Sequence, residues 1–500
     1  MDLFSNIALG LSTAASLENV LYAIFGALIG TLIGVLPGLG PLATISMLLP
    51  FTFGLDTLPA LIMLAGIYYG AAYGGSTTAI LVNLPGETAS AVTVIDGYQM
   101  ALKGRAGVAI ATAAIGSFVA GTVGTFVLAA FATPLANVAF RFGGVEYFSM
   151  MVLGLLAAVS LASGSMLKSV GMVLVGLILS MVGIDLNSGT PRFTFGQAHL
   201  WDGIDFIVLA VGLFAFGEIV SSLEGGESRQ SVTGKVIKLM PSREDFRRMF
   251  PAILRGTGIG SLVGVLPGAG MSMASFFSYG AEKRVSKHKE EFGKGAIEGV
   301  AGPESANNAA AQTAFIPTLT LGVPGSPVMA LMLGAMIMHG IQPGPTIMTN
   351  NPTLFWGLIA SMWIGNLVLV LLNLPLVGVW VKLLSVPYRA LFPAILVFCC
   401  IGIYSVQFAT FDIFLAVGAG VIGYGLRKLD CEPAPLVLGF VLGPIMEVNL
   451  RRALVHSRGD FSAFVTSPIS LGFLVAAVGI ILIVLLPAIR RRQNQIFSEG

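Results

Sequence analysis

The sequence predicts an all-α polytopic membrane protein made of two inverted repeats, each with a broken re-entrant helical hairpin, plus an extra C-terminal helix. Three observations lead to this fold class. Of the 500 residues, 55% are hydrophobic and 10% charged, whereas soluble domains have about 25% charged residues. About ten apolar runs are long enough to cross the hydrocarbon core of a bilayer, which takes roughly 20 residues. Finally, one glycine-rich segment occurs twice in the chain.

The repeated segment covers residues 26–40 and returns at 256–270, with ten of its fifteen positions identical. Each copy has a glycine at every fourth position and then a Pro-Gly-x-Gly break, at Pro37-Gly38 and at Pro267-Gly268. Proline removes a backbone donor and disfavours helical geometry in the residue before it, and glycine allows backbone angles that other residues resist.

We therefore expect two helical hairpins, at 19–55 and 256–280, in which a half-helix enters, turns at the break and leaves. A kinked full-length span is the alternative. The spaced glycines predict tight packing of the hairpin arms.

The first repeat is predicted to cover residues 1–223. The segment before residue 19 has no basic residue, so it lacks the start of a cleaved signal peptide, and we expect the first apolar run to be retained. A span at 58–85 is rich in hydroxyls and glycines and runs into Asn83-Leu-Pro-Gly-Glu87, and 88–105 is amphipathic or loop-like. Four ordinary spans follow at 106–131, 145–163, 166–185 and 204–223.

A basic loop is predicted at 224–255, where seven lysines and arginines gather. A cytoplasmic loop explains them better than a nucleic-acid patch, because basic residues mark the inner side of membrane proteins and the net charge is only +2. No nucleic-acid partner is expected.

The second repeat is predicted at 256–450. Basic residues lie on both sides of its hairpin, and a hairpin keeps both flanks on one side of the membrane, whereas a single crossing would not. Residues 302–325 mirror 58–86, and counting back from the Pro-Gly of each copy aligns Asn307 and Asn308 with Tyr68 and Tyr69. Later spans are expected at 353–381, 391–403, 408–426 and 435–448, before a C-terminal helix and basic tail at 451–500.

Five predicted crossings separate the two hairpins, and since five is odd, the two copies should point in opposite directions. The basic residues of the loops, Lys168 and Arg427 among them, then mark the inner side, with Arg451, Arg452 and Arg458 as exceptions. Inverted repeats whose broken helices meet near the bilayer midplane are the architecture of secondary transporters.

The broken helices predict the chemistry of the site. The N–H groups at the start of a half-helix suit a carboxylate, and the carbonyl groups at its end suit Na⁺. The second half-helices are expected to begin at about Pro41 and Met271. The candidate substrate-binding residues are Pro37, Gly38, Gly40, Pro267, Gly268, Gly270, Ser76, Asn83, Pro324, Gly325 and Ser326.

A coupling ion, Na⁺ or H⁺, is the only cofactor-like species expected, and no other metal. Its candidate ligands are the carbonyls near Leu36 and Leu266 and the side chains of Thr77, Asn307, Asn308, Glu304 and Glu87. Interhelical hydrogen bonding is the alternative role for the polar side chains, and a solvated interfacial carboxylate is the alternative for Glu87.

No enzyme motif is present. The chain has no His-Glu-x-x-His, no Gly-x-Ser-x-Gly in a suitable setting, and no Lys-Ser/Thr after either glycine run. Its three cysteines show no metal-binding spacing. A channel that uses the Pro-Gly loops as an anion filter remains the alternative to a transporter.

Three motif groups resemble the large membrane subunit of the tripartite tricarboxylate transporters. They are Gly34-Val-Leu-Pro-Gly-Leu-Gly40, then Tyr73-Gly-Gly-Ser76 with Asn83-Leu-Pro-Gly-Glu87, and Gly302-Pro-Glu-Ser-Ala-Asn-Asn-Ala309 with Leu321-Gly-Val-Pro-Gly-Ser326. The resemblance implies a multi-pass permease of the bacterial inner membrane, surrounded by lipid. It also implies a small membrane subunit with about four spans, a periplasmic binding protein that delivers the substrate, and import of citrate or another carboxylate driven by an ion gradient.

Overall fold

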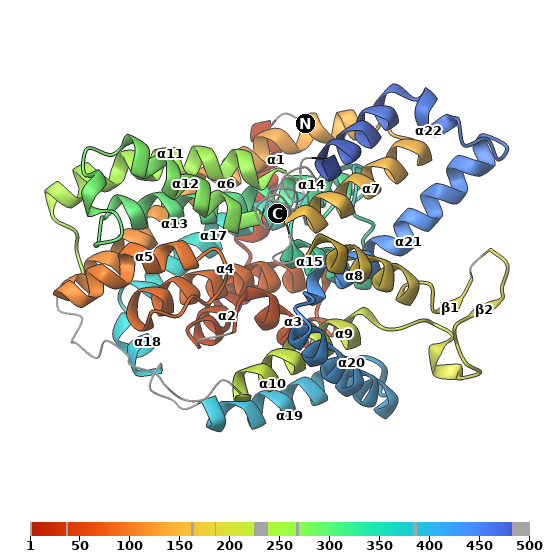
Figure 1. Ribbon diagram of the computed structural model, residues 1–500, viewed down its shortest axis with the longest axis horizontal. Coiled ribbons are helices and arrows are strands. Elements are labelled where there is room, and N and C mark those ends of the chain that lie inside the picture. The colour runs from red at the N-terminus through yellow and green to blue at the C-terminus, as the bar shows by residue number, and fades with distance from the viewer. Residues whose placement is uncertain are drawn as a thin grey trace, which may run out of the picture.

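The computed structural model describes residues 3–36, 39–161, 165–185, 187–224, 239–266, 270–383 and 388–482. Within these ranges the protein is helical except for turns, loops and the short antiparallel pair β1 (Gly183–Ile184) and β2 (Pro191–Arg192) (Figure 1). Six helical stretches are long and apolar enough to cross a membrane. The prediction of an all-α polytopic membrane protein is confirmed, and the inverted orientation of the repeats stays a prediction.

Fewer stretches reach spanning length than the ten apolar runs suggested. The six are Leu17–Gly34, Thr57–Val82, Ala91–Ala139, Pro352–Asn373, Thr410–Lys428 and Pro433–His456, and eight further apolar helices have 10–17 residues. The predicted span at 204–223, for example, is divided into three elements: α9 (Phe206–Ala210), a π-helical turn η3 (Val211–Phe216) and α10 (Gly217–Glu224). Residues 88–105, predicted as amphipathic or loop-like, form α5 (Ala91–Met100) and the π-helical turn η1 (Ala101–Arg105), which leads into α6 (Ala106–Ala139).

Both predicted breaks separate two helices. In the first repeat α2 (Leu17–Gly34) ends before the break and α3 (Pro41–Thr52) begins after it, with Pro41 as the first residue of α3. Proline suits this position because the first N–H of a helix has no intrahelical partner. In the second repeat α11 (Arg243–Gly264) precedes the break and α12 (Gly270–Val285) follows it. Pro37, Gly38, Pro267 and Gly268 lie outside the described residues.

The spaced glycines of α2 pack against α4 (Thr57–Val82), the helix that follows the hairpin, rather than against the other arm α3. A Cβ added at Gly26, Gly30 or Gly34 would collide with the backbone of Met63, Ile67 or Ala71, respectively. Sequence alone predicted close packing but placed it within the hairpin. The small residues bring the two helix backbones into direct contact.

The second repeat packs in the same register. The equivalent glycines of α11, Gly256, Gly260 and Gly264, meet the backbone of Gly302, Ala306 and Ala310 on α13 (Glu298–Thr313). Each of these partners lies 239 positions after its counterpart on α4, which is the offset that aligns Asn307 and Asn308 with Tyr68 and Tyr69. The two repeats therefore share one packing pattern as well as one sequence pattern.

The ends of the two units also match. Asn83 ends α4 with φ 61°, and Gly322, 239 positions later, ends α14 (Phe315–Leu321) with φ 69°. Both residues are left-handed, which asparagine and glycine tolerate best. A Pro-Gly step follows each of them and leads to a new helix, α5 in the first repeat and α15 (Pro327–Met338) in the second.

The helix α11 begins inside the segment that composition predicts as a loop. Ser242 and Asp245 form a capping box at its start, which satisfies two backbone donors. Farther along, Arg248 pairs with Glu298 at 2.8 Å and Arg255 pairs with Glu282 at 2.6 Å. Part of the basic segment is therefore a helix, and two of its arginines are paired with acidic residues of α12 and α13.

The first helix, α1 (Leu3–Ala14), was not predicted. It packs against α17 (Pro352–Asn373), where Gly10 lies against the backbone of Trp356.

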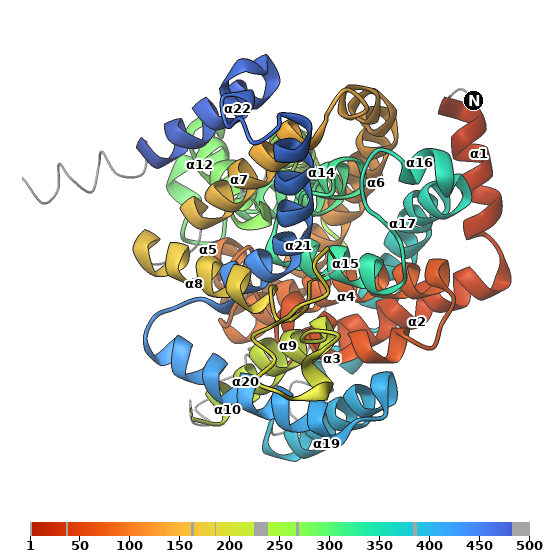
Figure 2. The ribbon, with the colours of Figure 1, turned by 90° about the vertical axis from the view of Figure 1, so that its right-hand side faces the viewer.

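The remaining elements are α7 (Gly144–Leu161), α8 (Met166–Leu179), α16 (Ile347–Asn350), α18 (Val377–Leu383), α19 (Tyr388–Gln407), α20 (Thr410–Lys428), α21 (Pro433–His456), α22 (Ala463–Thr466), and the 3₁₀ turns η2 (Ala198–Leu200) and η4 (Lys289–Glu291). Figure 2 shows α22 and α19 at opposite ends of the molecule, with α1 along one side.

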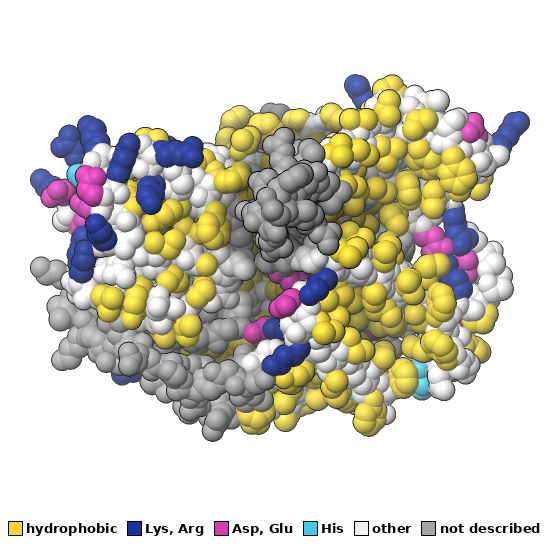
Figure 3. Space-filling view, in the orientation of Figure 1, with side chains coloured by type: hydrophobic (Ala, Val, Ile, Leu, Met, Phe, Trp, Pro, Cys, Tyr) yellow, Lys and Arg dark blue, Asp and Glu magenta, His cyan; other side chains and the backbone are white. Residues whose placement is uncertain are grey.

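Hydrophobic side chains cover much of the surface (Figure 3). Charged side chains gather at the end that holds α11 and α12, near the middle of this face, and at the opposite end of the molecule. This distribution is typical of a protein whose sides contact lipid.

Candidate functional site

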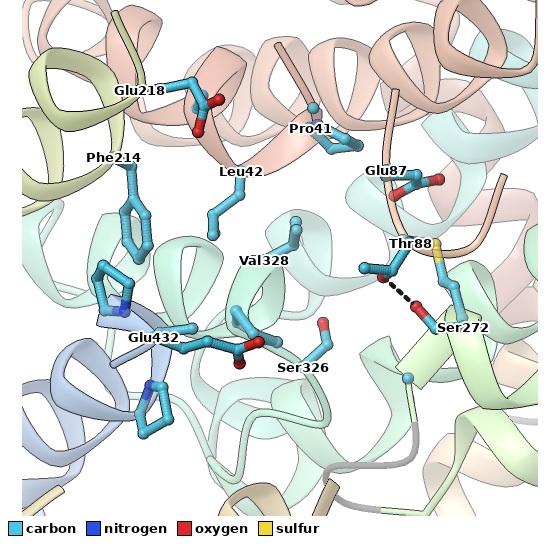
Figure 4. Close-up of a pocket in the computed structure, with 18 of the residues that line it drawn as sticks. Pro41, Leu42, Glu87, Thr88, Phe214, Glu218, Ser272, Ser326, Val328 and Glu432 are labelled. Atoms are coloured by element: carbon cyan, nitrogen blue, oxygen red, sulfur yellow. Dashed lines mark hydrogen bonds between the residues drawn. The ribbon is translucent and has the colours of Figure 1, made fainter. Parts of the chain in front are cut away.

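One cavity in the described part of the chain has a volume of about 1170 Å³, and helix starts from both predicted repeats line it. Gly40–Ala43 come from α3, Gly270–Met273 from α12 and Ser326–Val328 from α15, while Ala91 begins α5 and Pro433 begins α21. Figure 4 shows Pro41 and Leu42 on one side of this cavity and Ser326 and Ser272 on the other. Both predicted repeats therefore contribute to one space.

The converging helix starts contribute partial positive charges to the wall of this cavity. The first N–H groups of a helix have no intrahelical acceptor, and each N-terminus carries the equivalent of roughly half a positive charge. No side chain caps α3 at Gly40. At α15 the Ser326 Oγ accepts a hydrogen bond from the Met329 N–H at 3.2 Å, which satisfies one donor of that turn. Such a site suits carboxylate groups without a buried arginine.

Two contacts join the repeats at the cavity wall. The hydroxyls of Thr88 and Ser272 share a hydrogen bond between the loop after α4 and the start of α12 (Figure 4). Beside them, the Asn307 Nδ2 donates to the Glu87 Oε1 at 3.4 Å. Glu87 is half-buried and lines the cavity. With its hydrogen bond from Asn307, it is therefore not a carboxylate surrounded by solvent alone.

Charged side chains line another part of the cavity. Lys168 donates to the Leu429 carbonyl at 2.6 Å, and Arg427 pairs with Glu218. Asp430 and Glu432 lie on the same wall. The sequence interpretation treated Lys168 and Arg427 as topology markers. It could not place them on a cavity wall, because that position depends on how α8, α10 and α20 pack.

The structure divides the predicted substrate residues between several places. Gly40, Gly270 and Ser326 line the large cavity. Pro324 and Gly325 are buried beside it, and Asn83 is exposed at the end of α4. The predicted residues Pro37, Gly38, Pro267 and Gly268 lie outside the described residues, and Ser76 lines a second, smaller cavity.

The predicted cation residues are divided as well. Thr77 and Glu304 line the second cavity together with Ser76, and Glu87 lines the first. Asn308 donates to the Ser117 Oγ at 2.6 Å and to the backbone carbonyl of Glu304 at 3.0 Å.

The two predicted carbonyl ligands have different surroundings. The Leu36 carbonyl accepts from the Leu39 N–H at 3.2 Å, and the Leu36 side chain is buried. The side chain of Leu266 is 55% exposed. The two positions are therefore not equivalent in the structure, although the sequence repeats them.

Three residues of the second cavity region were missed by the sequence interpretation: Thr93, Ser117 and Asn373. None carries a motif signal: Ser117 and Asn373 are single polar residues in apolar segments, and nothing in the amphipathic segment 88–105 singles out Thr93. Among the described residues, no group of three or more His, Cys, Asp or Glu side chains could hold a metal ion.

Comparisons with known proteins identify the same family that the sequence motifs resemble. The family model described as "Tripartite tricarboxylate transporter TctA family" matches residues 20–438. The "Uncharacterized 52.8 kDa protein in TAR-I ttuC' 3'region" of Agrobacterium vitis is 58% identical over 499 residues, which are 100% of this chain and 99% of that protein. The "Uncharacterized protein in TAR-II ttuC' 3'region" of the same organism is 60% identical over 240 residues, 48% of this chain and 99% of that protein. No solved structure matches the chain significantly.

Proposed function

The chain belongs to the tripartite tricarboxylate transporter TctA family, and on this premise we propose that it is the large permease subunit of an ion-gradient-driven secondary transporter. It imports citrate or a related carboxylate. It works in the bacterial inner membrane with a small membrane subunit of about four spans and a periplasmic binding protein that hands over the substrate. The word "tripartite" in the family name supports partner subunits in general.

One observation carries the proposal: a single cavity of about 1170 Å³ collects the starts of α3, α12 and α15, which come from both repeats. A cavity of this size accommodates a small carboxylate, since ligand pockets are typically about 300–1,000 Å³. Several helix N-termini around one space bind several carboxylate oxygens at once, and each contributes favourable charge.

In this proposal helices around the cavity move so that the bound substrate faces alternate sides of the membrane, as in other transporters built from inverted repeats. The contacts that join the repeats at the cavity, Thr88 with Ser272 and Glu87 with Asn307, are weak enough to change during such a movement, because each is a single hydrogen bond.

The test is uptake of labelled citrate and other carboxylates into vesicles that contain all three components, with Na⁺ and pH gradients imposed separately. We expect accumulation against the concentration gradient and its loss when an ionophore collapses the driving gradient. Equilibration without accumulation would contradict a secondary transporter and favour the anion channel.

A cavity-filling variant links the transport to the site. Val328 is buried and lines the cavity, so Val328→Trp should abolish uptake by occupying the substrate's space. Phe414→Trp is the control, because Phe414 lies on the surface of α20 and is 74% exposed. Uptake by Val328→Trp at the wild-type rate would show that the substrate binds elsewhere.

A further inference from the structure

A second cavity lies among α4, α6, α13 and α17 and has a volume of about 10 Å³. This is about the space that one water molecule or one small ion occupies. Six oxygen-bearing side chains line it: Tyr73, Ser76, Thr77, Ser117, Glu304 and Asn373. The cavity is too small for a carboxylate substrate, so it requires a separate explanation.

Glu304 is a buried carboxyl group with no recorded ion pair in the described part of the chain. Its exposed fraction is 1%, and its two oxygens accept hydrogen bonds from Ser76, at 2.8 Å, and from Thr93. Two other buried glutamates of the same bundle, Glu282 and Glu298, each pair with an arginine. A buried carboxylate is stabilised by a cation or by several hydrogen-bond donors. Glu304 accepts from two hydroxyls, and none of the side chains lining this cavity carries a positive charge.

Asn373 supplies an independent sign of a missing ligand. Its side chain is 2% exposed, and its Nδ2 donates to the Leu369 carbonyl at 2.9 Å. Its Oδ1 is buried and has no hydrogen-bond partner. Buried polar oxygens are nearly always satisfied, so the unpartnered oxygen of a residue at the wall of this small cavity is available to a donor or a cation inside it.

We propose that this cavity is a binding site for one Na⁺ ion, which serves as the coupling ion of the transporter proposed above. Glu304 supplies the negative charge, and Asn373 Oδ1 with the hydroxyls of Ser76 and Thr77 supplies neutral oxygens. A hydroxyl that donates to Glu304 keeps its lone pairs for a cation. Hard cations prefer oxygen ligands, and one carboxylate balances one positive charge, whereas a divalent ion would leave a buried excess charge.

One face of α13 connects the ion to the substrate cavity. Glu304, Asn307 and Asn308 are spaced i, i+3 and i+4, so they lie on one side of the helix. Asn307 reaches Glu87 in the large cavity, while Asn308 contacts Ser117 of the small cavity and the Glu304 carbonyl. Ion binding at Glu304 therefore acts on the same helix that contacts the substrate cavity.

The test measures ion binding to the purified chain without substrate or partners. Thermal unfolding in detergent is followed as NaCl is titrated, with KCl and choline chloride at matched ionic strength. We expect a saturable rise of the melting temperature with Na⁺ alone. Glu304→Gln should abolish this rise, and Asn373→Ala should increase the half-saturating Na⁺ concentration about tenfold, the effect of losing about 1.4 kcal/mol of binding energy.

Asn449→Ala is the matched control. Asn449 is also a buried helical asparagine whose Nδ2 donates to a carbonyl four residues earlier, at 2.8 Å, but it lines neither cavity. It should keep the wild-type Na⁺ response. A wild-type protein without a Na⁺-specific rise, or an unchanged rise in Glu304→Gln, would overturn the ion site. If Glu304→Gln does not fold, Asn373→Ala and Thr77→Val decide the question in the same way.

This test separates the ion site from the proposed function. Carboxylate uptake driven by a pH gradient, with no Na⁺-specific stabilisation, would refute the Na⁺ site and leave the permease intact. Na⁺-specific stabilisation that needs Glu304, together with no accumulation of any carboxylate, would refute the permease function and leave the ion site intact.

Discussion

Single buried carboxyl groups of this protein are stabilised in different ways, and Asp96 shows the contrast with Glu304. Asp96 lies on α5 and is 0% exposed. Its Oδ1 accepts from the N–H groups of Gly293, Gly295 and Ala296 at 2.9, 2.7 and 2.9 Å, and its Oδ2 accepts from the Tyr279 hydroxyl at 2.9 Å. Four donors satisfy this carboxylate without a cation. Asp96 therefore joins α5 of the first repeat to the segment between α12 and α13.

Asp96→Ala should destabilise the protein strongly, because three backbone N–H groups would lose their acceptor. Each buried unsatisfied group costs about 1–3 kcal/mol. We expect a melting temperature well below that of the wild type in detergent, with early proteolysis near residues 286–297. Asp56→Ala is the control, since Asp56 is exposed and its side chain makes no capping hydrogen bond to α4. Equal melting temperatures for the two variants would contradict this role of Asp96.

At the scale of the element, the helix pairs α2–α4 and α11–α13 show why the chain repeats its glycines. Each pair brings two backbones into contact through small residues on one face. The faces that point elsewhere carry larger side chains, such as Leu262 on α11, which is 76% exposed. A helix face that contacts a neighbouring backbone tolerates no side chain, whereas a face that contacts lipid or solvent tolerates many.

Two variants of one helix test this packing. Gly260→Leu should prevent the contact with Ala306 and give aggregated or unfolded protein, because overpacking against a rigid backbone costs about 1–3 kcal/mol or more. Gly258→Leu should be tolerated, since a Cβ at Gly258 would have no neighbour within 4 Å. The measurement is the fraction that elutes as a single species in detergent. Similar profiles for both variants would show that the glycine face does not determine packing.

The β1–β2 hairpin is held to α21 by charge. The Asp185 carboxylate accepts from the Asn187 N–H at 2.8 Å and pairs with Arg451 at 2.6 Å. These interactions, the backbone hydrogen bond first, lower the pKa of Asp185 to about 2. A depressed pKa means that the stabilisation is present above the ordinary value for aspartate, about 3.9, and is lost as pH falls through about 2.

Pepsin digestion checks this pH dependence, because the enzyme is active in acid. The hairpin should resist cleavage near pH 4 and become cleaved near pH 2 as Asp185 is protonated, whereas Asp185→Asn should be cleaved at both values. Protection of the wild-type hairpin at the lower pH would show that Asp185 does not hold it in place.

At the scale of the whole molecule, the two predicted repeats share one pattern of helix packing. Their opposite orientation in the membrane stays a prediction. The odd number of predicted crossings places residues 56 and 294 on opposite sides. The basic residues of α11 contribute less to this argument than their number suggests, because Arg248 and Arg255 are bound to acidic side chains.

Cysteine labelling tests the inverted topology. In a cysteine-free background, Asp56→Cys and Lys294→Cys, both exposed positions, should react with a membrane-impermeant maleimide from opposite sides of oriented vesicles. Labelling of both from the same side would rule out inverted repeats.

The sequence alone determined that the protein is all-α with several membrane-spanning helices, and it located the helix breaks. Hydropathy and charge are averages over many residues, and the effects of Pro41 at a helix start or of Asn83 at a helix end act within a few residues. Such local features can be predicted without knowing which helices pack together. This is why the starts of α3 and α12 were predicted to within one residue, although α11 was found to begin earlier than composition suggested.

Only the tertiary structure decided which of these ends meet. The separation of Ser326 from Ser76 into two cavities, the place of Lys168 and Arg427 on a cavity wall, and the unpartnered oxygen of Asn373 beside Glu304 all depend on contacts between helices far apart in the chain. Helix packing is set by side-chain shape over whole faces, and a single polar residue in an apolar run has no local signature of the partner it will face.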